Sequence, residues 1–200
     1  LSLCISHALV FFSYTLQETI LPLYYQTHHG WSVSTTGLLF ALFIFSCGFC
    51  ARFLSIPILI GDIMNPIDLY TLGIVIACLG AAFLALVTTP LYLCIAFILY
   101  GLGLGSAMVT LAFLTKTLLS SIDAAQVQDI SWVRSLIAYS SLIGMVGGPL
   151  VSLGIMQISQ TMTFFNLEIV ANCFYLSWIF CMWLFFEYFL GFIQHTSQCF

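Results

Sequence analysis

Long hydrophobic runs, separated by short polar segments, make up most of this chain. Six of these runs are long enough to cross a bilayer as helices. They cover residues 3–25, 35–60, 69–87, 91–113, 131–155 and 162–190. Apolar and polar residues do not alternate within them, as they would in the strands of a membrane barrel. The pattern predicts an all-α integral membrane protein, with six transmembrane helices in one domain that covers residues 1–200.

The middle of the chain gives the clearest membrane signal. Residues 69–115 carry no charge, and Thr88-Thr89-Pro90 is the break within them. This stretch is too long for one span and suits two spans of about 20 residues each. The whole chain is 62% hydrophobic and 5% charged, whereas soluble domains contain about 25% charged residues. Because lipid cannot satisfy backbone polar groups, these runs are expected to be helical.

The few charges and the cysteines exclude several classes of partner. Three basic residues cannot form a surface for nucleic acid. The eight cysteines lie almost entirely inside apolar runs, where cysteine usually serves as a small core residue. Cys47 and Cys50 have the spacing of metal ligands, but no second Cys or His pair lies near them. We therefore expect no nucleic-acid partner, no metal site and no cofactor.

The basic residues predict the orientation in the membrane. Lys116 and Arg134 flank the connection between the fourth and fifth runs, and Arg52 lies in the second half of the second run. The positive-inside rule then places both termini and the even-numbered connections in the cytoplasm. The chain begins with leucine, so it is expected to be part of a longer chain or to have a misplaced start.

Glu18 is the strongest candidate for a functional residue. It lies inside the first hydrophobic run, four residues before Pro22. A carboxylate at the centre of a membrane helix costs about 2.5–3.5 kcal/mol on insertion scales, so such residues usually have a role. Two interpretations stay open. The carboxylate could bind a proton or gate transport, or it could reach the membrane surface or a neighbouring helix.

Glycines form two ordered sets. In the fourth run, Gly101 and Gly105 stand four residues apart on one helix face, with Gly103 between them. This spacing lets helix backbones touch in a membrane. In the fifth run, Gly144 and Gly148 precede Pro149, which predicts a kink. The kink could serve packing alone, or it could act as a hinge during alternating access.

Several of these motifs resemble one family of transporters. They are Glu18-Thr-Ile-Leu-Pro-Leu-Tyr-Tyr, Gly30-Trp31-Ser32, Thr36-Gly37-Leu38-Leu39-Phe40, Gly101-Leu-Gly-Leu-Gly-Ser-Ala and Gly144-x-x-x-Gly148-Pro149. In this order they are similar to spans seven to twelve of a major facilitator superfamily transporter. The similar branch contains the drug:proton antiporters and the vesicular transporters, including many fungal permeases.

The resemblance implies a function, a setting and partners. The chain would move a small organic solute or drug-like compound by alternating access, with or without proton coupling, in a plasma, vacuolar or vesicular membrane. It would need an N-terminal six-helix half or a second copy to complete the path. Glu18, Pro22, Arg52 and Asp62 would be the candidates for transport or gating, and Arg52 could pair with Asp62.

Some residues depart from that family. The turn that begins at Gly61-Asp62 has an acid but lacks the family's basic residues. The acids of the amine-transporting branch fall near Thr110 and Ala138, which argues against a vesicular amine substrate. A truncated or degenerate half-transporter that moves nothing is therefore the alternative.

An intramembrane serine protease is the main rival from another class. Ser106 lies in Gly-Ser-Ala, and the last histidine, His195, follows the sixth run. Since a serine nucleophile needs a base within hydrogen-bonding reach, we do not expect an enzyme.

Overall fold

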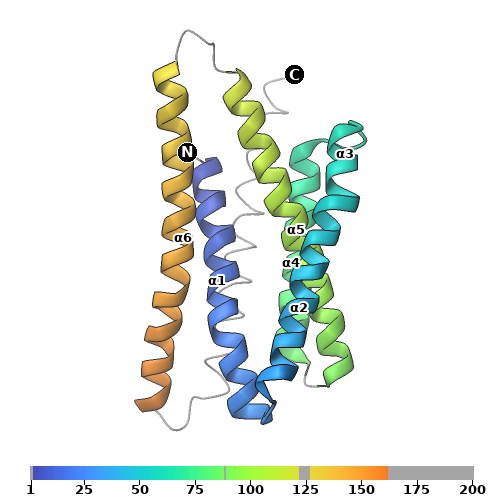
Figure 1. Cartoon of the computed structure of the whole chain (residues 1–200), viewed down its shortest axis with the longest axis vertical. Helices are drawn as coiled ribbons and strands as arrows, with labels where there is room; N and C mark the ends of the chain where they lie inside the picture. The colour runs from blue at the N-terminus through green and yellow to red at the C-terminus, as the bar shows by residue number, and fades with distance from the viewer. Residues whose placement is uncertain (1, 88, 122–126, 162–200) are drawn as a thin grey trace, which may run out of the picture.

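The chain folds into long helices. The computed structural model describes residues 2–87, 89–121 and 127–161. Its helices are α1 (Ser2–His29), α2 (Val33–Phe49), the π-helix η1 (Cys50–Ser55), α3 (Ile56–Ile60), α4 (Pro66–Leu86), α5 (Pro90–Ser121) and α6 (Val127–Thr161), as Figure 1 shows. Within these ranges no strand is present, so the all-helical prediction is confirmed. The sixth predicted span, 162–190, lies outside the described residues.

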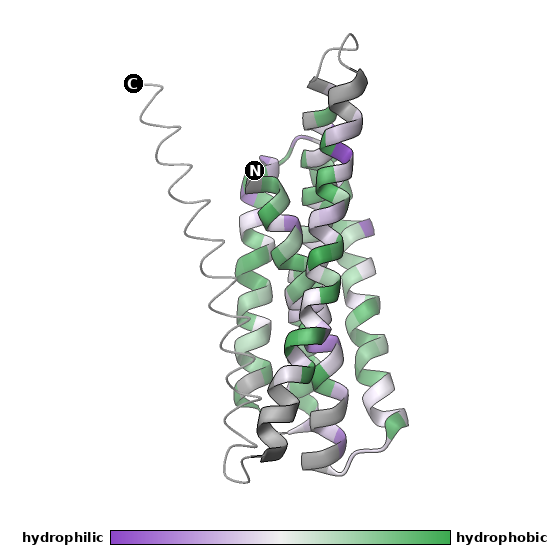
Figure 2. Cartoon of the chain, turned by 90° about the vertical axis from the view of Figure 1, so that its left-hand side faces the viewer, coloured by the Kyte–Doolittle hydropathy of each residue, from purple (hydrophilic) through white to green (hydrophobic). Residues whose placement is uncertain are grey.

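Four helical stretches are long and apolar enough to cross a membrane. They are Val33–Ile60, Pro66–Leu84, Pro90–Thr117 and Ser131–Gly154. Hydrophobic residues run along most of the length of the helices in Figure 2. Helix α1 is long enough, with 28 residues, but its polar residues keep it outside this set. The described residues form an all-helical, multi-pass membrane protein.

Apolar side chains are exposed and polar side chains are buried at many positions, as expected for a protein surrounded by lipid. On α6, large apolar side chains are exposed along one face, and Ile143 is 68% exposed. They include Trp132, Tyr139, Ile143 and Leu150, at the spacing of a single helix face. Many of the buried residues are polar instead, among them Ser6, Ser13, Gln17, Thr110 and Ser152. Because lipid solvates an apolar surface, such a face needs no protein partner.

Helix α5 is in backbone contact with helices on two sides. Gly101 and Gly105 face α2, where a methyl group added to Gly101 would lie 2.6 Å from the carbonyl oxygen of Phe43. Gly103 faces α4, and a methyl group there would overlap the backbone of Gly73 and Ala77. The alternation of these glycines along α5 therefore lets α2 and α4 pack closely on different faces.

A second pair of helices is formed by α1 and α6. Gly144 packs against the Ala8 carbonyl, and Gly148 packs against Thr15 and the Leu16 amide. The hydroxyl of Thr15 donates to the carbonyl of Gly144 at 3.3 Å. Both glycines thus lie at a helix contact.

The helix α6 continues through Pro149. Ser152 lies one turn beyond this proline, and its hydroxyl donates to the Leu16 carbonyl at 3.3 Å. The contact with α1 thus continues past Pro149, while hinge motion there stays a prediction.

The bundle is divided into two groups of helices. Helix α6 packs along α1, while α5 packs extensively on α4 and α2. Contacts of α1 with α2 and α5 are far fewer. Figure 1 shows α1 and α6 side by side, with α2, α3 and α4 on the other side of the bundle. A boundary therefore runs along α1, between the α1–α6 pair and the α2–α5 group.

The second predicted span, 35–60, is not one regular helix. Its middle is η1, in which the amide of Ile56 donates to the carbonyl of Ala51, five residues earlier. Pro57 follows at once, and a proline cannot donate to the previous turn and clashes with its carbonyl. The wider π turn relieves this clash, because it moves the preceding carbonyls away from the proline ring. Such bulges often mark functional sites.

Helix α5 extends past the predicted end at residue 113, to Ser121. Thr115 and Thr117 donate their hydroxyls to the carbonyls of Leu111 and Phe113, at 2.8 and 3.0 Å. These hydroxyls are satisfied by their own helix. The helix therefore continues beyond the apolar run into a polar segment.

We predict that Gly103→Ala lowers the stability of the bundle by about 1–3 kcal/mol, since the added methyl group meets backbone atoms that cannot move aside. The measurement is the midpoint of denaturant unfolding in a neutral detergent. Gly48→Ala is the matched control, because nothing lies within 4 Å of its added methyl group. Its stability should be unchanged or higher by up to about 1 kcal/mol. Equal midpoints for the two variants would contradict the close contact.

Candidate functional site

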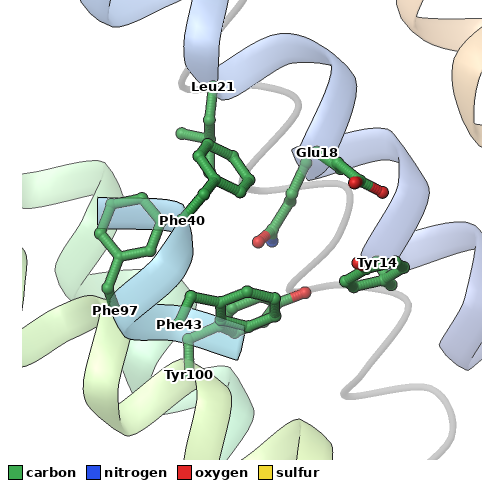
Figure 3. Close-up of a pocket in the computed structure, with 8 residues that line it drawn as sticks. Tyr14, Glu18, Leu21, Phe40, Phe43, Phe97 and Tyr100 are labelled. Atoms are coloured by element: carbon green, nitrogen blue, oxygen red, sulfur yellow. The ribbon is translucent and has the colours of Figure 1, made fainter. Parts of the chain in front are cut away.

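A hollow lies on the boundary between the two helix groups. It is narrow and partly open, with a volume of about 10 Å³. Figure 3 shows how its side chains converge from three helices. Those of α1 are Tyr14, Gln17, Glu18 and Leu21, those of α2 are Phe40 and Phe43, and those of α5 are Phe97 and Tyr100.

The α1 side of the hollow follows from helix spacing. Tyr14, Glu18 and Leu21 recur at intervals of four and three residues, which places them on one helix face. Gln17 is buried, whereas Glu18 is exposed. The side chains of Tyr14 and Glu18 both lie at the rim of the hollow. The structure therefore places Glu18 at the mouth of a hollow and beside a phenol.

Stacked rings from α1, α2 and α5 form an aromatic wall of the hollow. The Tyr14 and Phe43 ring centroids are 5.9 Å apart, and those of Phe43 and Tyr100 are 5.4 Å apart. This stack joins α1, α2 and α5. The hydroxyls of Ser13 and Tyr100 are 3.5 Å apart. Such ring pairs add to the energy of burial, so the wall is mainly apolar, with phenol oxygens at its edge.

A second set of rings continues the wall. Phe40 meets Phe97 edge-on at 5.8 Å, and Phe97 lies 6.3 Å from Tyr25. Tyr25 stacks on Trp31 at 5.1 Å. The wall thus extends from the hollow to the connection between α1 and α2.

Pro22 lies beside the hollow but does not line it. It is half-buried inside α1 and directly follows Leu21. Because proline has no N–H, it cannot make the usual helical hydrogen bond to the Glu18 carbonyl. The Glu18 carbonyl therefore lacks the helical hydrogen bond that a residue other than proline would donate, and the Glu18 side chain carries a charge.

Arg52 and Asp62 lie away from Glu18. Arg52 is exposed on η1, nine residues past Phe43, which is about 13 Å along a helix axis. Asp62 is exposed in the turn after α3, with a left-handed φ of 47°. No ion pair joins these two side chains in the described part of the chain. The structure does not bring the four transport candidates together.

Other sequence candidates have packing roles in the structure. Thr110 is fully buried and donates to the Ser106 carbonyl at 2.8 Å, while Ala138 is exposed on α6. The backbone of Cys47 packs on Gly105, and the Cys50 sulfur is 3.8 Å from the Ser55 hydroxyl. Among the residues with described positions, no group of three His, Cys, Asp or Glu could hold a metal ion.

The sequence pointed to aromatic residues of the first two runs as a cavity lining but identified none of them individually, and it did not point to the rings of α5. Tyr14 precedes Glu18 by four residues, and this spacing could have marked it as a neighbour on the same helix face. Phe43 and Tyr100 gave no such signal, since aromatic residues in apolar helices are common. Their convergence depends on how α2, α5 and α1 pack.

His7 joins the two helix groups away from the hollow. Its Nε2 atom lies 3.1 Å from the Thr115 hydroxyl on α5, and its Nδ1 atom lies 3.5 Å from the Ser141 hydroxyl on α6. One imidazole thus connects three helices. It is one of the polar links between α1 and the α2–α5 group.

No family model matches the chain, and no curated protein matches it either. The function therefore has to be inferred from the hollow, the charges and the division of the bundle.

We predict that His7→Ala lowers stability by about 1 kcal/mol, because the stronger bond to Thr115 is lost in a water-poor region. Ser141→Ala serves as the comparison and should have a smaller effect, since it removes only the 3.5 Å contact. Unfolding midpoints in neutral detergent measure both. A His7→Ala midpoint equal to that of the unchanged protein would rule out a stabilising role for this link.

Proposed function

We propose that this chain is the transport domain of a facilitator-type secondary transporter, which moves a small organic solute by alternating access. The observation that carries the proposal is the position of the hollow. It holds Glu18 and lies between two separately packed helix groups. In secondary transporters, one repeat rocks against another around a site between them. The rocking partner of this chain would be an N-terminal half or a second copy.

The size of the hollow supports a site with a further wall. Pockets for drug-sized ligands measure about 300–1,000 Å³, whereas this hollow measures about 10 Å³, so it would form only one wall of a solute site. Its open side could be closed by an N-terminal six-helix half or by a second copy of the chain. Helix α1 would then be a fifth spanning helix, with its polar residues turned away from lipid.

The orientation proposed from the basic residues is consistent with the fold. Lys116 lies near the end of α5, and Arg134 lies near the start of α6. These two helix ends lie at the same end of the bundle (Figure 1). Under the positive-inside rule this end would face the cytoplasm, in a plasma, vacuolar or vesicular membrane.

A degenerate half-transporter that moves nothing is the second candidate. The turn at Asp62 favours this candidate, because it contains an acidic residue but lacks the basic residues found there in the family that the chain resembles. Asp62 and Arg52 are both exposed and are not paired with each other within the described residues. A latch between helices would therefore be missing at this end.

The mass of the native polypeptide distinguishes a chain with an attached N-terminal half from one that functions alone or as two copies. An immunoblot with an antibody to residues 116–129 should detect a product about twice the 22.2 kDa of this sequence, because an attached N-terminal half would complete the path. A product near 22.2 kDa would contradict an attached half. Chemical crosslinking in the native membrane would then show whether two copies associate, and a monomer without transport would support the degenerate form.

We predict that Glu18→Gln abolishes the pH dependence of solute uptake into proteoliposomes, since the amide keeps the shape of the side chain but cannot accept the proton. The solute comes from a screen of small organic cations, anions and neutral compounds. Asp68→Asn is the matched control: it removes an exposed acid at the start of α4, away from the hollow. An unchanged pH profile in Glu18→Gln would exclude proton coupling at this residue.

A further inference from the structure

We propose that η1 is a register switch, in which the π turn converts to a regular α-helical turn and α3 rotates about its axis while α2 stays in place. The switch belongs to the helix itself, so it does not depend on whether the chain transports a solute. It gives a role to the π turn, which the proposed function leaves without one.

The buried positions of this segment skip one residue at η1. Along α2, buried residues follow one another at intervals of three and four, as on one face of an α-helix. Between Cys50 and Ser55 the interval is five, and from Ser55 to Leu59 it is four again. Five is the spacing of a π-helical hydrogen bond. The π turn therefore holds one extra residue and keeps the buried faces of α2 and α3 in line. The buried residues are Thr36, Leu39, Phe43, Ser46, Cys50, Ser55 and Leu59.

A second register of the same sequence also buries apolar side chains. In an uninterrupted α-helix, the next buried position would be Phe53 or Leu54, and the one after it Pro57. In the structure these residues are exposed, Phe53 by 63% and Leu54 by 46%. The two registers thus present different residues of η1 and α3 to the bundle. They differ by a rotation of about 100°, which is the turn per residue of an α-helix.

The two ends of the segment are held differently. Helix α2 is fixed by backbone contact with α5, since a methyl group added to Gly101 would lie 2.6 Å from the Phe43 carbonyl oxygen. Helix α3 has five residues, and its backbone contacts within the described residues are mainly with η1. It lies at an end of the bundle (Figure 1) and is followed by a turn at Gly61 and Asp62. Rotation of α3 therefore leaves the packing of α2 on α5 intact.

Two local interactions favour the observed register. In an α-helix, the ring of Pro57 would clash with the carbonyl of Phe53, four residues earlier. In the π turn, the Cys50 sulfur lies 3.8 Å from the Ser55 hydroxyl oxygen, and both side chains are buried. An α-helical turn would place these two side chains about 140° apart around the helix. The π register is therefore the major state, and the α register is the minor one.

The rotation of α3 reorients the turn that follows it. Asp62 lies in this turn, with a left-handed φ of 47°. Elements with two discrete packings convert a small local bias into a larger movement of a neighbouring segment. A minor state populated at about 0.1–10% is one that a bound ligand or partner can select. The switch thus makes the end of the bundle that carries Asp62 responsive to binding.

A fluorine label at position 53 reports on the register. Para-trifluoromethyl-phenylalanine replaces Phe53 in the full chain, and fluorine saturation-transfer NMR in a neutral detergent detects exchange with a minor state. The unchanged sequence around the label should give a major resonance from the exposed ring and a minor state from the buried ring. Pro57→Ala should raise the minor population by at least about tenfold, because the clash that disfavours the α register is removed.

A disulfide locks the π register. Ser55→Cys brings a second thiol close to Cys50, and oxidation by copper phenanthroline joins the two sulfurs only while the π turn is present. Mass spectrometry confirms the bond. The minor state should disappear on oxidation and return on reduction. Ser55→Ala is the matched control, since it changes the same position and receives the same oxidant but cannot form this bond. Its minor state should persist.

The outcomes separate a switch from a static π turn. A minor state that grows in Pro57→Ala and disappears in oxidised Ser55→Cys supports the switch. Absence of a minor state in both the labelled protein and labelled Pro57→Ala overturns it, and so does a minor state that persists after the disulfide has formed. Where Ser55→Cys fails to fold, Pro57→Ala still decides: a minor population that does not rise overturns the switch.

Discussion

Backbone contact at the glycines of α5 is the constraint on which the rest of the structure depends. Lipid removes the hydrophobic drive between helices, so packing has to come from small residues that let backbones meet. Gly101 meets the carbonyl of Phe43, and the backbone of Tyr100 meets Gly80 on α4. The two rings that form the wall of the hollow therefore sit directly at these glycine contacts. Their stacking at 5.4 Å is a consequence of how closely α5 approaches its neighbours.

Helix α1 has a different relation to the bundle. Its glycine contacts come from α6, at Gly144 and Gly148, while its contacts with α2 and α5 are few. Its buried polar residues, including Ser13 and Gln17, turn toward protein. Among the described residues, α1 therefore packs closely on α6 and loosely on α2 and α5. The same polarity keeps α1 outside the set of helices that are apolar enough to cross a membrane on composition alone.

Much of the helical content could be predicted from the sequence, because membrane helices satisfy their own backbone groups wherever an apolar run is long enough. The apolar pattern did not show two local details. The π-helix η1 precedes Pro57, and α5 continues to Ser121 through threonines whose hydroxyls bond to their own helix. The possible pairing of Arg52 with Asp62 was suggested by their shared end of the second run, but both side chains are exposed and apart.

The sequence by itself determined the membrane character and the all-helical fold of the described residues, since both depend on hydropathy and on the length of the apolar runs. The tertiary structure alone decided that Glu18 lines the same hollow as Phe43 and Tyr100, and that a boundary runs along α1. These residues are 25 or more positions from Glu18 in the chain, so no local pattern relates them. Their meeting depends on which glycine faces which helix, and that is a property of packing in three dimensions.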